Sequence, residues 1–179
     1  GVEIPKNVAG LMLAAIISDT LLFRSPTCTK TDKEIALELA EIAGVDAEEF
    51  GFAMFKAGTS LVGKSIEEIY NQDYKAFNIG DAKVGIAQVN TMDIDGFAPL
   101  KAEMLEYMEN LCVENGFDTA VLLLTDVINA TSEVFVAGSH PEYVENAFNV
   151  QLVEHEANLP GVISRKKQVV PAITRAINA

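Results

Sequence analysis

Positive charge and histidine are both scarce in this sequence of 179 residues. Lysine and arginine together number 13 against 26 acidic residues, which gives a formal net charge of -13 at pH 7. Nucleic acids and anionic membranes are bound mainly through extended basic surfaces, so this charge excludes a general surface of either kind. Any anion-binding site must therefore be local. The 2 histidines, His140 and His155, are not at the spacing of a metal-binding pair.

Cysteine is equally sparse. Cys28 and Cys112 lie in unrelated contexts and form neither a disulfide framework nor a metal-binding quartet. The amino terminus does not resemble a signal peptide, so we expect a reducing, cytoplasmic location. The sequence also lacks a glycine-rich phosphate loop and a G-x-S-x-G nucleophile motif. It begins at Gly1 without methionine, and we interpret it as part of a longer protein.

Long hydrophobic runs are absent as well. The apolar stretch at residues 8–17 is shorter than the about 20 residues that a membrane span requires. It is apolar nearly all round, which predicts a helix buried on most of its faces. A capping box at Thr31 and Glu34 predicts the start of the next helix, and Gly44 its end. We expect helices in residues 1–58 and a linker at residues 59–65.

Residues 66–179 are expected to form an α/β domain with a mixed sheet of about five strands and flanking helices. Alternating patterns at residues 75–79 and 83–91 predict a hairpin. The apolar run at residues 120–124 is typical of a central strand that is covered on both faces. Residues 133–137 predict its neighbour, and Val162 and Ile163 predict a last short strand.

The scarce cations gather in one place, the run Ser164-Arg165-Lys166-Lys167-Gln168. Such a run can simply be a solvated face. Here it stands in an acidic protein, between a predicted strand and a final helix. That junction would place Arg165 and Lys166 near a helix amino terminus, where free backbone donors and the helix dipole favour an anion. Arginine adds a fork that suits oxyanions.

Asp19 is the second candidate site residue. It follows the apolar stretch and precedes Leu21 and Leu22, so a carboxylate there is costly unless it is paired, hydrogen-bonded or bound to metal. A turn cap or a pair with Arg24 would satisfy it, and so would a metal ion. Asp126, at the end of the apolar strand, has a similar ambiguity between a site residue and a turn former.

Several segments resemble the family II, manganese-dependent inorganic pyrophosphatases of the DHH phosphoesterase superfamily. The resemblance lies in residues 14–27 and 161–171, which include S-D-T-L-L-F-R-S-P-T and S-R-K-K-Q, and extends to residues 40–49 and 86–91. It covers essentially the whole chain. The S-R-K-K-Q run is specific to these pyrophosphatases.

The resemblance implies an enzyme that hydrolyses pyrophosphate to two phosphates at a two-metal site between two domains. It implies Asp19 as a ligand that bridges the metal ions, which are manganese, with magnesium or cobalt as alternatives. It implies that Lys75, Arg165 and Lys166 bind the substrate phosphates. The complete enzyme could form a homodimer, and neither nucleic acid nor a membrane is an expected partner.

The sequence departs from the family pattern at its start. The H-x-x-x-D-x-D and D-H-H motifs, which supply the other metal ligands, are absent. Residues 1–58 would then be the last helices of an otherwise missing amino-terminal DHH domain, and residues 66–179 the complete carboxyl-terminal domain. We expect the 179-residue chain alone to have little activity. Alternatives are an isolated, non-catalytic anion-binding domain and a related DHH phosphoesterase that acts on polyphosphate or nucleotides.

Overall fold

A computed structural model describes residues 3–179, which divide into two compact units. The first unit ends at Ser60 and the second runs from Leu61 to Ala179, so the boundary falls within the predicted linker segment 59–65. Within residues 3–179, every helix is too short or too polar to cross a membrane.

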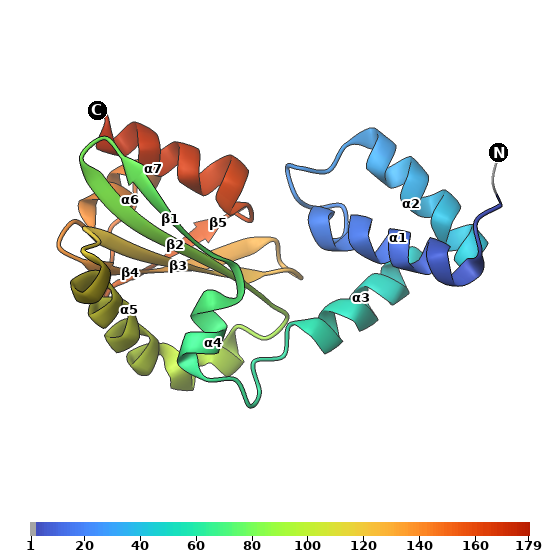
Figure 1. Ribbon diagram of the computed structural model, residues 1–179, viewed down its shortest axis with the longest axis horizontal. Coiled ribbons are helices and arrows are strands. Elements are labelled where there is room, and N and C mark those ends of the chain that lie inside the picture. Colours follow the sequence, from blue (N-terminus) through green and yellow to red (C-terminus); the bar gives the residue numbers. More distant parts are fainter. Residues whose placement is uncertain (1–2) are drawn as a thin grey trace. The chain divides into compact units, whose positions relative to one another are not determined.

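Three helices make up the first unit (Figure 1). They are α1 (Lys6–Thr20), α2 (Lys30–Ala43) and α3 (Ala47–Gly58). The prediction that the apolar helix is buried on most faces is wrong. Its buried residues lie on one stripe that includes Leu13 and Ile17, whereas Leu11 is 71% exposed and Val8 and Met12 are also exposed. The first unit therefore covers only one side of α1.

Capping side chains decide where α2 begins. The predicted capping box at Thr31 is wrong by two residues, because Thr29 caps the helix. The Asp32 carboxylate accepts hydrogen bonds from the Thr29 N–H and hydroxyl, both at 2.7 Å, and the Thr29 hydroxyl accepts from the Asp32 N–H. This pair has the same spacing as Thr31 and Glu34. The predicted end at Gly44 is confirmed, with φ of 73°.

The second unit is built on a five-stranded mixed sheet with strand order β1-β2-β3-β4-β5. The strands are β1 (Tyr74–Ile79), β2 (Ala82–Thr91), β3 (Thr119–Asp126), β4 (Thr131–Gly138) and β5 (Glu156–Pro160). Strands β2 and β3 are parallel and the other pairs are antiparallel. The predicted α/β class, mixed sheet and hairpin are confirmed.

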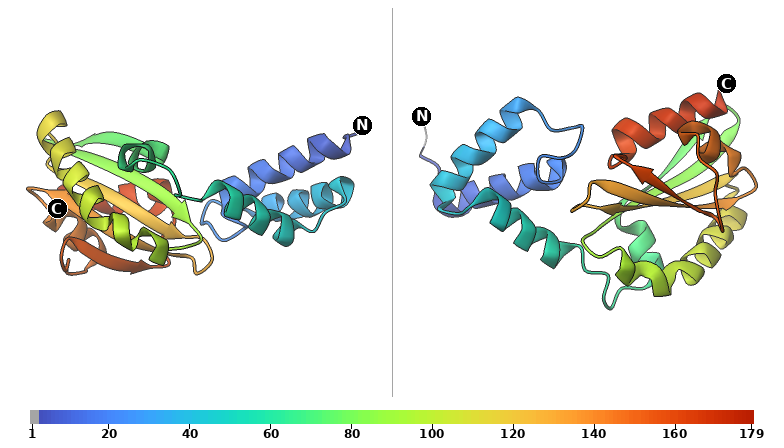
Figure 2. Two further views of the ribbon diagram at one scale, coloured as in Figure 1. Left: turned by 90° about the horizontal axis from the view of Figure 1, so that it is seen from below. Right: turned by 180° about the vertical axis from the view of Figure 1, so that it is seen from behind.

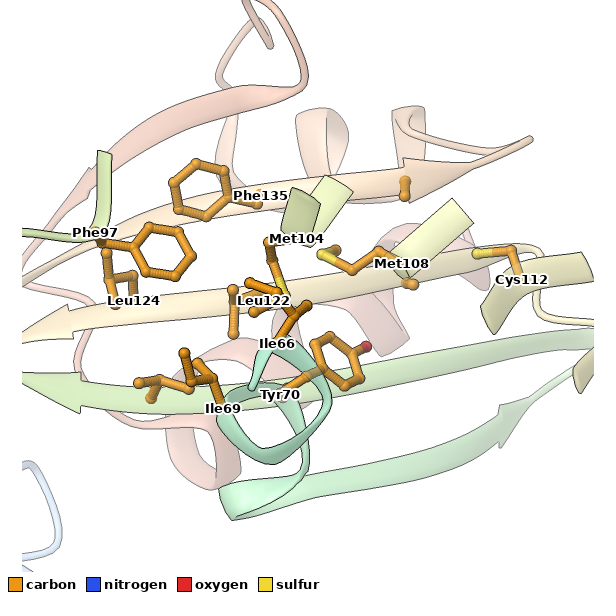
Figure 3. Packing of buried hydrophobic residues seen from close by; sticks show 14 of the residues in the cluster. Ile66, Ile69, Tyr70, Phe97, Met104, Met108, Cys112, Leu122, Leu124 and Phe135 are labelled. Carbon is orange, nitrogen blue, oxygen red and sulfur yellow. The ribbon is translucent and has the colours of Figure 1, made fainter. Parts of the chain in front are cut away.

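Two helical layers cover the sheet (Figures 1 and 2). One face carries α4 (Ile66–Tyr70) and α5 (Lys101–Asn115), and the other carries α6 (Glu142–Phe148) and α7 (Val170–Ile177). Figure 3 shows the first of the two cores, in which Tyr70, Met104 and Leu122 pack together. Strand β3 lies between both cores and is buried along its whole length.

The predicted last strand at Val162 and Ile163 is wrong. Val162 and Ile163 do not form a strand, because their two carbonyls and the Ile163 N–H bond to side chains instead of to a neighbouring strand. The last strand is β5, whose mixed sequence E-A-N-L-P carries no alternating signal. The segment before α5 forms a 3₁₀ helix, Asp95–Leu100, with Pro99 inside it.

Candidate phosphate-binding site

The five residues Ser164–Gln168, here called the basic loop, form a tight turn that leads into α7. Residues Arg165–Val169 are π-helical, with Val169 N–H donating to Ser164 O at 3.2 Å. The Ser164 hydroxyl caps the turn by accepting from Lys167 N–H at 3.3 Å. Single π-helical turns occur frequently at functional sites. The predicted place at a helix start is thus confirmed, but a loop and not a strand precedes it.

The backbone donors of the basic loop are mostly occupied. Gln168 Oε1 accepts from Ile163 N–H and Ser164 N–H at 2.9 and 3.0 Å, and Gln88 Oε1 accepts from Arg165 N–H at 3.0 Å. The sequence prediction of free backbone donors at this point is therefore wrong. Side chains fill those positions, so an anion here would have to be bound chiefly by cationic side chains.

Arg165 is buried, with 9% of its side chain exposed. Its guanidinium Nη2 donates to Asp73 Oδ1 at 2.6 Å, and Nη1 donates to Asp73 O and, at 3.3 Å, to Ile86 O. These bonds use three of the five guanidinium N–H groups. The Nε–H and one Nη2–H have no further partner within residues 3–179.

The arrangement brings Arg165 and the strand of Lys75 together. Lys75 in β1 pairs with Ile86 in β2, the residue whose carbonyl accepts from Arg165. Asp73, the other partner of Arg165, lies two residues before Lys75. The side chains of Lys75 and Lys166 are exposed, and neither makes an ion pair in the described part of the chain. Two exposed lysines thus lie close in the chain or in strand pairing to the groups that the buried Arg165 binds.

Asp19 lies in the other unit, in the last turn of α1, and is exposed. The Arg24 guanidinium lies over the Phe52 ring, 5.8 Å from its centroid. Three consecutive non-glycine residues follow with φ of 46° to 65°, Leu21 to Phe23. Such backbone costs about 1–3 kcal/mol per residue and is concentrated at functional sites.

Metal ligands are not grouped in the part of the chain that the structure describes. No three His, Cys, Asp or Glu side chains of residues 3–179 lie together as a metal site. Mn²⁺ takes several oxygen and nitrogen ligands, so the residues present do not fit a complete site, and Asp19 could supply only one ligand. Asp126 is a turn former, since its carboxylate accepts from Ile128 N–H and Asn129 N–H at 2.7 and 3.0 Å.

Two residues of this site were not anticipated from the sequence. Gln88 faces the same side of the sheet as Val84 and Ile86. A polar residue in this otherwise apolar alternating pattern was the signal that could have identified it. Asp73 carried no such signal, because it lies in a short 3₁₀ turn, Asn71–Asp73, among other polar residues.

Comparisons with known proteins identify the family of this chain. The DHHA2 domain family matches residues 53–176. The chain is 57% identical to a cobalt-dependent inorganic pyrophosphatase of Clostridium perfringens and 53% identical to a protein of Clostridium acetobutylicum named as a manganese-dependent inorganic pyrophosphatase. Each alignment covers 99% of this chain, but 32% and 57% of the relatives.

A solved structure shares the fold. It is the crystal structure of a Methanococcus jannaschii protein assigned to the family II inorganic pyrophosphatases, with a TM-score of 0.90 and 44% sequence identity. The match covers 99% of this chain and 58% of that one. The resemblance drawn from the sequence motifs is confirmed, and this chain spans between a third and three fifths of the length of these relatives.

Proposed function

Because this chain belongs to the DHHA2 domain family, we propose that it supplies the phosphate-binding part of an inorganic pyrophosphatase. The observation that carries this proposal is the contact of Arg165, in the basic loop, with Asp73 and Ile86, which respectively precede Lys75 and pair with it. This contact brings the basic loop to the segment that carries Lys75, in a protein whose net charge is -13. The names of the Clostridium relatives support pyrophosphate as the substrate.

Each cation has a distinct task in this proposal. Lys75 and Lys166 present mobile ammonium groups that pair with phosphate oxygens. Arg165 holds the loop against Asp73 and β2 and offers its two remaining N–H groups to an oxygen. Pyrophosphate hydrolysis increases negative charge on the phosphate oxygens, and fixed cations beside them stabilise the transition state more than the ground state.

Asp19 is the metal ligand that this chain contributes. A single exposed carboxylate cannot hold two Mn²⁺ ions, or Mg²⁺ or Co²⁺ in their place, so the other ligands come from sequence outside these 179 residues. The greater length of the relatives supports this origin. The exposed apolar face of α1 also supports it, because Leu11, Val8 and Met12 are the kind of surface that a further domain covers.

We expect the enzyme to work in a reducing compartment such as the cytosol. Both cysteines are free thiols in the structure. Burial raises the pKa of Cys112 to about 11, which keeps this thiol protonated and unreactive at neutral pH.

Hydrolysis assays test the proposal and its alternatives. The 179-residue chain with Mn²⁺ should release no phosphate from pyrophosphate, while the full protein encoded by the gene should hydrolyse it in preference to tripolyphosphate or ATP. Manganese-dependent turnover by the short chain would refute the assignment of the missing ligands to other sequence. A preference of the full protein for longer polyphosphates or nucleotides would instead favour a related DHH phosphoesterase.

A further inference from the structure

A continuous chain of hydrogen bonds joins three neighbouring strands to the residues in front of the basic loop. Gln88 on β2 donates through Nε2 to Thr125 Oγ1 on β3, at 2.9 Å. The Thr125 and Ser132 hydroxyls lie 2.9 Å apart, and Ser132 on β4 donates to Val162 O at 2.6 Å. These polar side chains lie where the sheet face would otherwise continue as apolar core.

The direction of each bond follows from the groups at its ends. The Val162 carbonyl can only accept, so the single hydroxyl proton of Ser132 is directed at it and Ser132 must accept from Thr125. Thr125 in turn accepts from Gln88. Successive donors and acceptors that point the same way strengthen one another in a buried environment. Gln88 is therefore the first donor of an ordered relay.

Gln88 also binds the loop backbone directly, and with both ends of its amide. Its Nε2 donates to Ile163 O at 3.0 Å, and its Oε1 accepts from Arg165 N–H at 3.0 Å. The amide orientation is fixed, because Ile163 O only accepts and Arg165 N–H only donates. A side chain that bonds residues on both sides of Ser164 sets the position from which Arg165 and Lys166 project.

From this network we infer that Gln88 is a positioning residue for phosphate binding: it holds the basic loop so that Lys166 and Arg165 meet the phosphate oxygens. The inference rests on the proposed function, since it assigns Gln88 a role at that site. Gln88 does not itself touch the anion, because all of its polar atoms bond to protein groups. Its contribution is to fix the loop before the ligand arrives, which lowers the entropy cost of binding.

The test measures inorganic phosphate binding to the 179-residue chain by isothermal titration calorimetry. Gln88→Met keeps the length of the side chain but removes every hydrogen bond, and should weaken phosphate binding about tenfold, the lower range seen when outer-shell bonds at ligand sites are lost. Val84→Ala is the matched control. It perturbs the same strand and the same face without touching the basic loop, and should leave the affinity within about twofold.

A readout of position separates this role from general destabilisation. Arg165 N–H should exchange with solvent faster in Gln88→Met than in Val84→Ala, because only the first loses the acceptor of that N–H. The effect of Gln88→Met should also shrink in a Lys166→Ala background, since a misplaced loop no longer matters once its exposed cation is gone.

A second variant, Ser132→Ala, keeps the role of Gln88 testable. If Gln88→Met fails to fold, Ser132→Ala removes the bond to Val162 O and should weaken phosphate binding about threefold. Wild-type affinity in the folded Gln88→Met variant, or in Ser132→Ala when that variant replaces it, would overturn the inference alone, provided that Lys166→Ala still weakens binding. No phosphate binding by the wild-type chain would overturn the proposed function and this inference with it.

Discussion

The ion pair between Arg165 and Asp73 gives the sharpest prediction. It holds Arg165 in place, but its Asp73 carboxylate should also repel a bound phosphate. Asp73→Asn keeps an oxygen acceptor for Nη2 but removes the negative charge. Arg165 is 9% exposed and Asp73 is 56% exposed. The substitution therefore leaves a buried cation with hydrogen bonds to Asp73 O and Ile86 O and without a neutralising anion.

Asp73→Asn should have two opposite effects, a lower free energy of unfolding and tighter phosphate binding. Removal of one partner from a fully buried pair costs about 3–5 kcal/mol, and exposed pairs contribute about 0–1 kcal/mol. With one partner exposed and the carbonyl bonds retained, we expect a loss of about 1–2 kcal/mol in the free energy of unfolding. Removal of a water-exposed carboxylate from beside a phosphate relieves about 1 kcal/mol of repulsion, the energy between two unit charges about 4 Å apart in water, which is about fivefold tighter phosphate binding.

Urea denaturation measures the stability, and titration calorimetry at low salt measures the phosphate affinity. Asp81→Asn is the matched control, since Asp81 is an exposed aspartate in the turn of the same β1–β2 hairpin. It should change neither quantity appreciably. Lower stability with unchanged affinity in Asp73→Asn would show that Arg165 only ties the loop to Asp73 and β2. Weaker binding would show that the ion pair itself keeps the loop competent.

Three further predictions concern the fold of the second unit. The buried Tyr70 hydroxyl has no hydrogen-bond partner in residues 3–179, so Tyr70→Phe should raise the free energy of unfolding by about 1 kcal/mol (Figure 3); a clear loss would indicate a hidden partner. Burial raises the pKa of Cys112 to about 11, so its stabilising protonated form is fully present below about pH 9. Above that pH the free energy of unfolding should fall in the wild type, and it should fall less in Cys112→Ala. Equal slopes of stability against pH in urea titrations would refute this. Gly138 has φ of 104°, and a Cβ there would lie 2.5 Å from Asp118 O. Gly138→Ala should therefore destabilise by about 1–3 kcal/mol, clearly more than Gly116→Ala, where nothing lies within 4 Å of the added carbon. Similar melting temperatures for the two variants would contradict the clash.

Local signals in the sequence were sufficient for most of the fold. The hairpin of β1 and β2 and the buried strand β3 follow from side-chain periodicity, because strand alternation and core burial leave a direct pattern. The start of α2 could not be placed, since Thr29 and Thr31 offer capping boxes of equal spacing. Strand β5 was missed because an edge strand requires no alternating side-chain pattern. Its pairing with β4 determines where it forms.

The candidate site was predictable only in part, for physical reasons. Charge scarcity and the motif pointed to Arg165 and Lys166, because both signals can be read from the sequence without a structure. The burial of Arg165 against Asp73 depends on a contact across 92 positions of sequence, which no local pattern encodes. The relay from Gln88 likewise joins three strands, although a glutamine among inward-facing apolar residues was a visible anomaly.

Titration of pyrophosphate into the wild-type chain and into the Lys75→Ala/Lys166→Ala double variant tests the central claim most directly. A double variant of Lys33→Ala and Lys56→Ala removes the same charge from exposed positions on α2 and α3 and serves as the control. We predict at least about tenfold weaker binding in the first double variant and a change within about twofold in the second. Equal losses in both would contradict the account, because the basic loop would then be a solvated surface and not a binding site.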